Sequence, residues 1–161
     1  MTELKLHVDA EVHKKLAADL FNATWDFIEK PNRSEADDET MVHAAHASRF
    51  HWGMAGTPLH FARGEWLISR VYALTGRAEP AMFHAEKSLS LCLRHQLNDF
   101  DTGFAYEALA RACEIQGDAA RRDEYLALAL QAAQRVEREN DRTWLLENIH
   151  TVSSGTLPAW D

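Results

Sequence analysis

Two short stretches of the sequence carry charged and aromatic side chains at helical spacing. Each set has the spacing i, i+3, i+7, namely Arg63, Trp66 and Arg70 in one stretch and Phe104, Glu107 and Arg111 in the other. Residues three and four apart lie on one helix face, so each set predicts a single stripe. Guanidinium groups hold carboxylates through paired hydrogen bonds, and aromatic rings receive apolar side chains. The two stripes therefore predict a groove that binds an extended peptide.

The same stripes have a second interpretation, as ion pairs that belong only to the fold. Carboxylates occur close to the arginines in the sequence, and their pairing would leave a salt-bridged helix surface without a ligand. In this interpretation three arginines, Arg63, Arg70 and Arg111, pair with Glu65, Glu107 and Glu114. The sequence leaves both interpretations open.

A further set of potentially reactive side chains lies on the second predicted helix. Glu39, His43 and His46 have the spacing i, i+4, i+7, so a carboxylate and two imidazoles share one face. Such ligands suit a divalent transition metal. The pattern lacks the glutamate of an HExxH motif, and His60 or His84 would have to supply a third imidazole. A small helical metalloprotein or metal-assisted enzyme is therefore the alternative to a binding module, which needs no cofactor.

The composition limits the classes of function. The chain has 161 residues and a formal net charge of −8, which disfavours binding to nucleic acid or to an anionic membrane. It has no run of 18 apolar residues and no apolar segment near its start, so we expect neither a membrane span nor a cleaved signal. Cys92 and Cys113 fall inside helical patterns and are predicted to be buried thiols of a cytoplasmic protein.

The hydrophobic pattern predicts one all-α domain of seven helices. Apolar residues recur every three to four positions, and glycine, proline and capping residues separate the segments. Short connections make successive helices antiparallel neighbours. Three tryptophans, Trp25, Trp52 and Trp144, are interpreted as core anchors. The predicted units are hairpins over about 10–54, 58–96 and 101–138, a capping helix over about 141–151 and a tail at 153–161.

Two of these hairpins repeat each other, because Gly76 and Gly117 end similar helices 41 residues apart. The shared frame is large, aromatic, glycine and small residues: Ile68, Tyr72, Gly76, Ala81 and Ala85 in one hairpin, and Tyr106, Leu109, Ala110, Gly117 and Ala129 in the next. In this frame the chain resembles tetratricopeptide (TPR) repeats with a long period. The resemblance implies a short right-handed stack whose first helices line a concave face.

In such a stack both stripes would lie on the concave face. The leading prediction is therefore a non-enzymatic module that binds a protein or peptide segment, with His43 and His46 contributing from the first hairpin. Arg63, Arg70 and Arg111 would be charge clamps, and Trp66 an apolar platform. A third possibility is a structural adaptor whose concave face is filled by a second copy of the chain in a homodimer.

Overall fold

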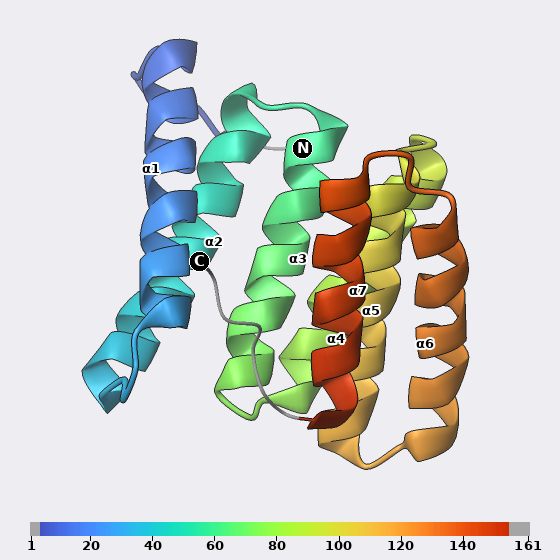
Figure 1. Cartoon of the computed structure of the whole chain (residues 1–161). Coiled ribbons are helices and arrows are strands. Elements are labelled where there is room, and N and C mark those ends of the chain that lie inside the picture. The colour runs from blue at the N-terminus through green and yellow to red at the C-terminus, as the bar shows by residue number, and fades with distance from the viewer. Residues whose placement is uncertain (1–3, 155–161) are drawn as a thin grey trace.

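The computed structural model describes residues 4–154, and the tail predicted at 153–161 lies almost entirely outside this range. Within it the chain forms seven α-helices and no strand, which confirms the all-α prediction (Figure 1). The helices are α1 (Ala10–Glu29), α2 (Glu35–Ala55), α3 (Pro58–Leu74), α4 (Ala78–Arg94), α5 (Asp99–Gln116), α6 (Ala119–Gln134) and α7 (Glu139–Ser154). None of them has the length and apolar content to cross a membrane.

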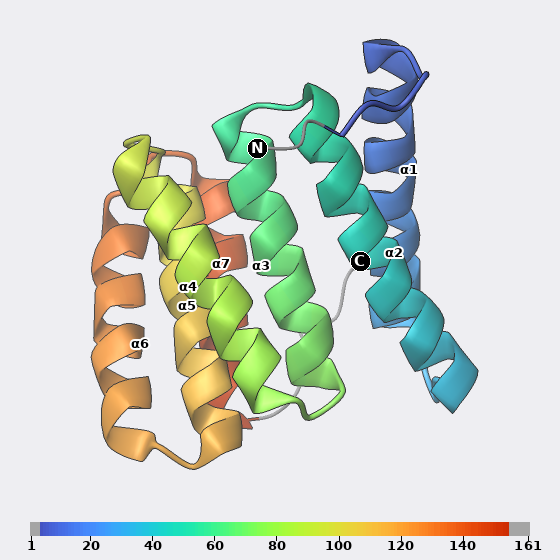
Figure 2. The same cartoon turned by 180° about the vertical axis from the view of Figure 1, so that it is seen from behind.

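The helices pack in pairs that follow their order in the chain. α1 packs on α2, α3 on α4 and α5 on α6, and the pairs are joined by contacts of α2 with α3 and of α4 with α5. α7 packs on α5 and α6. The odd-numbered helices also contact one another in succession, whereas α2, α4 and α6 do not. The described helices therefore form two layers, and Figures 1 and 2 view them from opposite sides.

Local sequence signals explain where several helices begin. A capping box opens α2, because Ser34 Oγ accepts from the Asp37 amide at 3.1 Å and Asp37 Oδ2 accepts from the Ser34 amide at 2.9 Å. α5 is capped by Asn98, whose Oδ1 accepts from the Asp101 amide at 3.0 Å.

Two glycines end the first helices of the second and third hairpins. Gly76 and Gly117 have φ of +75° and +79°, the left-handed conformation that glycine adopts without strain. α4 begins at Ala78, so Pro80 is its third residue. Pro80 is tolerated there because the first amides of a helix have no intrahelical acceptor.

One continuous core runs through the stack. Its large, fully buried members include Met41 from α2, Leu67 and Ile68 from α3, Leu109 from α5 and Leu145 from α7. Between α5 and α6 the core is built from alanines, which lets the two backbones approach closely. This packing fixes the odd-numbered helices relative to one another. The side chains on the faces of these helices that point away from the core are therefore also held in place.

Candidate ligand-binding cavity

Three of the predicted binding residues form a buried network instead of an open groove. Glu107 is 0% exposed and accepts from Arg70 Nη2 at 3.0 Å and from Arg111 Nη2 at 2.6 Å. Its second oxygen accepts from Trp66 Nε1 at 3.3 Å. Arg70 also donates to Asn148 Oδ1 of α7 at 3.0 Å. A ligand arriving from solvent would not reach Arg70 or Glu107.

The charges in this network stabilise each other. Burial alone would raise the pKa of the Glu107 carboxyl, but Arg70 and Arg111 more than offset it, so the pKa is lowered and the group is ionised at neutral pH. Burial, followed by repulsion from Arg111, lowers the pKa of Arg70 to about 10, so the guanidinium keeps its charge. The network therefore joins α3, α5 and α7 through ionic hydrogen bonds.

The ionic interpretation thus describes Arg70 and Arg111, which both pair with one of the predicted carboxylates, Glu107. The other pairs differ from those predicted: Arg63 pairs with Asp101, Glu65 with Arg49 and His84, and Glu114 with Arg122. These partners come from neighbouring helices, which sequence spacing along one helix does not reveal.

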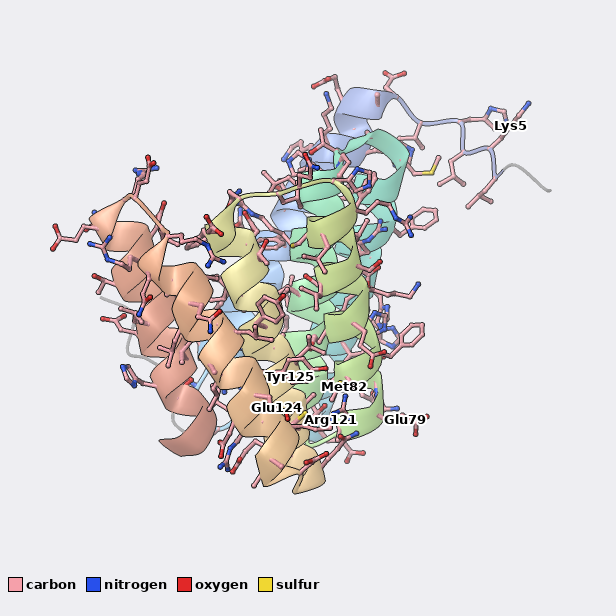
Figure 3. The ribbon with its side chains drawn as sticks, turned by 90° about the vertical axis from the view of Figure 1, so that its right-hand side faces the viewer. Lys5, Glu79, Met82, Arg121, Glu124 and Tyr125 are labelled. Atoms are coloured by element: carbon pink, nitrogen blue, oxygen red, sulfur yellow. The ribbon has the colours of Figure 1, made fainter. Side chains whose placement is uncertain are left out.

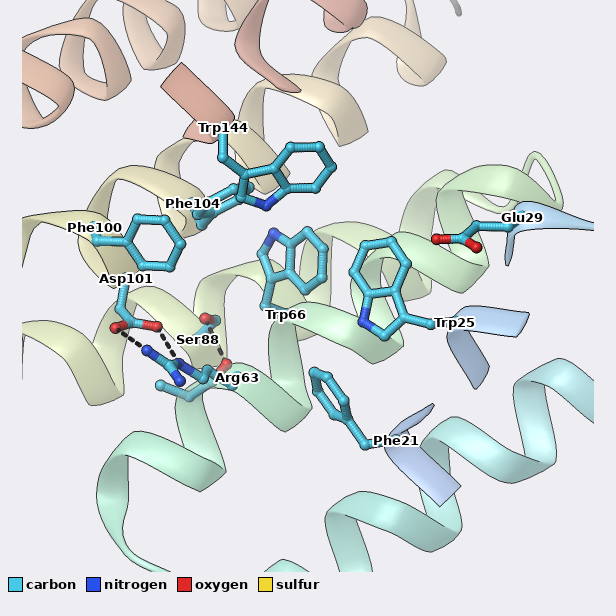
Figure 4. Close-up of a pocket in the computed structure, with 11 residues that line it drawn as sticks. Phe21, Trp25, Glu29, Arg63, Trp66, Ser88, Phe100, Asp101, Phe104 and Trp144 are labelled. Carbon is cyan, nitrogen blue, oxygen red and sulfur yellow. Dashed lines mark hydrogen bonds and ion pairs between the residues drawn. The ribbon is translucent and has the colours of Figure 1, made fainter. Parts of the chain in front are cut away.

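The other three residues of the two stripes, Arg63, Trp66 and Phe104, meet at a cavity of about 410 Å³ (Figure 4). It lies between the odd-numbered helices, with one small contribution from α4. The lining residues are Phe21, Trp25 and Glu29 of α1, Ala62, Arg63 and Trp66 of α3, Ser88 of α4, Phe100, Asp101 and Phe104 of α5, and Trp144 of α7.

Aromatic rings make up most of the cavity wall. Trp25 stacks on Trp66 with centroids 5.7 Å apart and planes at 25°. Phe104 meets Trp66 edge-on at 5.4 Å, and Phe100 meets Phe104 edge-on at 4.9 Å. Trp144 of α7 completes the set. Such offset and edge-on pairs hold the rings rigidly beside the open space.

Charged groups lie at opposite ends of this aromatic wall. Arg63 donates to both oxygens of Asp101, at 2.7 and 3.1 Å, and this bond raises the pKa of the guanidinium. Asp101 is only 6% exposed, whereas the Arg63 side chain is 45% exposed. Figure 4 shows Glu29 beside Trp25, across the rings from the pair of Arg63 and Asp101.

The histidines predicted to assist the groove do not line the cavity. His46 Nε2 lies 2.8 Å from the Tyr72 hydroxyl, and its ring is 5.4 Å from that of His84. Burial and then the neighbouring His84 lower the pKa of His46, so its neutral form is favoured. His43 and Glu39 are exposed on α2.

The geometry also bears on the alternative metal site. His84 Nδ1 donates to Glu65 Oε2 at 2.7 Å, so the imidazole nearest His46 is already bonded to a carboxylate. Within residues 4–154, no three histidine, cysteine, aspartate or glutamate side chains converge in a way that could hold a metal ion. Glu39, His43 and His46 share a helix face without forming a ligand cluster.

Sequence reasoning missed more than half of the cavity. Trp25 and Trp144, which the sequence predicts to be core anchors, do pack against the core, but each is only partly buried and also lines the open space. Phe21, Trp25 and Glu29 repeat every four residues, a spacing that marks one face of α1. That face was a usable signal, because the first helix of each hairpin was already expected on the concave side.

Comparison of the chain with known protein families, with curated proteins and with solved structures finds no match.

Proposed function

We propose that this protein is a non-enzymatic module that binds a peptide or protein segment by taking side chains into the aromatic cavity. The observation that carries this proposal is the convergence of six aromatic side chains from four helices around about 410 Å³ of open space. Burying rings completely would stabilise the fold more than leaving them beside a void. Aromatic anchors in pockets are also the usual centres of binding energy at interfaces.

The arrangement of the helices supports this proposal. A TPR-like stack would bring its first helices together into one binding face, and α1, α3, α5 and α7 do contact one another in that order. Buried thiols at Cys92 and Cys113 suit the reducing cytoplasm, where we propose that the module works. A second copy of the chain is the other candidate partner.

The proposed roles of the eight candidate residues now divide into three groups. Arg63, Trp66 and Phe104 remain ligand contacts, because they line the cavity. Arg70, Glu107 and Arg111 support it, because Glu107 holds Trp66 Nε1 and both guanidinium groups from behind. We assign His43 and His46 no role in the cavity.

The test is peptide selection on the full chain. A displayed library of random heptapeptides is selected against the protein, and the enriched sequences are synthesised and titrated by fluorescence anisotropy. Phe100→Ala should weaken binding at least about tenfold, the scale of a hot-spot side chain. Phe83→Ala is the matched control, because Phe83 is 53% exposed on α4 and does not line the cavity.

Two results would contradict the proposal. If the library yields no peptide that binds, the proposed peptide-binding function is wrong. Peptides that bind the wild type and Phe100→Ala equally well would show that another surface binds them. Circular dichroism of both variants confirms that each is folded before titration.

A further inference from the structure

We propose that the cavity takes a cationic side chain, a lysine or arginine of the bound peptide, rather than a carboxylate. This inference rests on the proposed peptide-binding function and specifies its ligand. It departs from the sequence-based expectation, in which Arg63 would hold a peptide carboxylate. The reasons are the pairing of Arg63, the position of Glu29 and the nature of the rings between them.

Among the described residues, Arg63 is the only cation that lines the cavity, and its charge is already neutralised. Asp101 accepts from Nε and from Nη2 of Arg63, so the fork that would grip a ligand carboxylate is occupied. Asp101 is nearly buried and is held by the Arg63 guanidinium. The negative charge of Asp141 is also close enough to raise the pKa of Arg63. A ligand carboxylate would have to displace a bidentate ion pair and approach a second acidic residue.

The carboxylate at the other end is available. Glu29 is exposed, and its carboxylate makes no ion pair or hydrogen bond with any residue of the described part of the chain. The described residues of the lining carry two carboxylates and one guanidinium, so this part of the cavity has a net negative charge. The whole chain adds to this potential with its net charge of −8.

The rings between these groups favour a cation over a neutral group. The face of an aromatic ring attracts a cation, most strongly for tryptophan and most strongly where water is excluded. Trp66 already has the Arg70 guanidinium 4.9 Å from its centroid. Trp25 lies four residues before Glu29 on the same face of α1, so the aromatic wall and the Glu29 carboxylate border the same part of the cavity.

A basic side chain fits both parts of this site. Its methylene stem is apolar and can lie along the rings while its charged head reaches the carboxylate. Figure 4 shows Glu29 next to Trp25 at the α1 end of the cavity. An apolar residue beside it in the peptide would fill the end formed by Phe100 and Phe104.

The experiment uses the heptapeptides selected on the full chain. The expected consensus contains a lysine or arginine next to an apolar residue. For the best lysine peptide, acetylation of that lysine should weaken binding at least about tenfold, because it removes the charge and keeps the stem. Glu29→Gln should lower the affinity for the unmodified peptide by a similar factor. It should hardly change the affinity for the acetylated peptide.

Glu124→Gln is the matched control, because Glu124 is an exposed carboxylate on α6, a helix that contributes no residue to the cavity (Figure 3). It should leave the affinity unchanged. Selected peptides that lack basic residues, or that bind equally well after acetylation, would overturn the cation proposal. Peptide binding in the cavity would still stand if Phe100→Ala weakens it at least about tenfold. Binding that is insensitive to Phe100→Ala would overturn both proposals.

Discussion

Replacing Glu107 with alanine should destabilise the protein strongly without changing its helix content before unfolding. The carboxylate accepts from Arg70, Arg111 and Trp66 and is 0% exposed. Its removal leaves two guanidinium groups without a counter-charge. Arg70 is the more affected, because its side chain is 1% exposed and Asn148 would be the only acceptor left to it among residues 4–154. Within the same range its Nη1 already has no hydrogen-bond partner.

The magnitude follows from the burial of the pair. Removing one partner of a buried ion pair costs about 3–5 kcal/mol, because an uncompensated charge remains in the interior. For a chain of this length each kcal/mol lowers the melting temperature by about 2–4 °C, so the expected decrease is about 6–20 °C. Such a loss is a large part of the roughly 5–15 kcal/mol that stabilises a typical domain.

The assay is urea unfolding followed by far-UV circular dichroism, with free energies obtained by linear extrapolation. Glu114→Ala is the control, because Glu114 pairs with Arg122 near the surface and its loss should leave the midpoint almost unchanged. A cost below about 1 kcal/mol for Glu107→Ala would refute the reasoning, since that is the range of an exposed pair. Replacing Arg70, Glu107 and Arg111 together by Met, Leu and Met should recover much of the loss.

Three further predictions concern other helix contacts. Burial and then the neighbouring His13, whose Nδ1 lies 2.8 Å from that of His51, lower the pKa of His51 below its ordinary 6.5. The stability that this histidine contributes is therefore complete above its unfolded-state pKa and is lost as the pH falls towards the folded-state pKa. Lowering the pH from about 7.5 to about 5.5 should reduce the urea midpoint of the wild type, and should reduce it less in His51→Gln. Gly103→Ala should destabilise the protein by about 1–3 kcal/mol in the same assay, although alanine has the better helix propensity. The reason is that the new Cβ would lie 2.5 Å from Cδ2 of the fully buried Leu145. An increase in stability would show that α7 can shift. Burial raises the pKa of the Cys92 thiol to about 12, so labelling of that cysteine with a thiol reagent, followed by mass spectrometry, should be slow in the native protein and fast in urea; rapid native labelling would contradict its burial.

The helices were predictable because their signals are local. Apolar spacing, the capping box at Ser34 and the glycines at 76 and 117 each act within a few residues, and the structure uses all of them. A local signal fixes a boundary less closely where a residue is only tolerated, as at Pro80, which α4 accommodates in its first turn. Local chemistry was therefore sufficient for the fold class.

The site was only partly predictable because burial is a tertiary property. Arg63 and Arg70 have equivalent positions on one stripe, yet Arg63 is 45% exposed in its side chain and Arg70 is 1% exposed. The difference comes from α7, whose Asn148 is 78 residues from Arg70 in the sequence. A stripe of polar residues on a helix does not reveal whether a later helix covers part of it.

The way in which α7 is attached has a consequence for the length of the array. Its Asn148 and Thr151 accept from the arginines of α3 and α5, while Trp144, one turn earlier, lines the cavity. Inserting another hairpin between α6 and α7 would carry these acceptors away and leave both guanidinium groups buried without them. Repeat proteins usually gain or lose units with little cost. In this chain the hydrogen bonds of Asn148 and Thr151 connect α7 to α3 and α5. The number of hairpins therefore cannot change unless these hydrogen bonds are replaced.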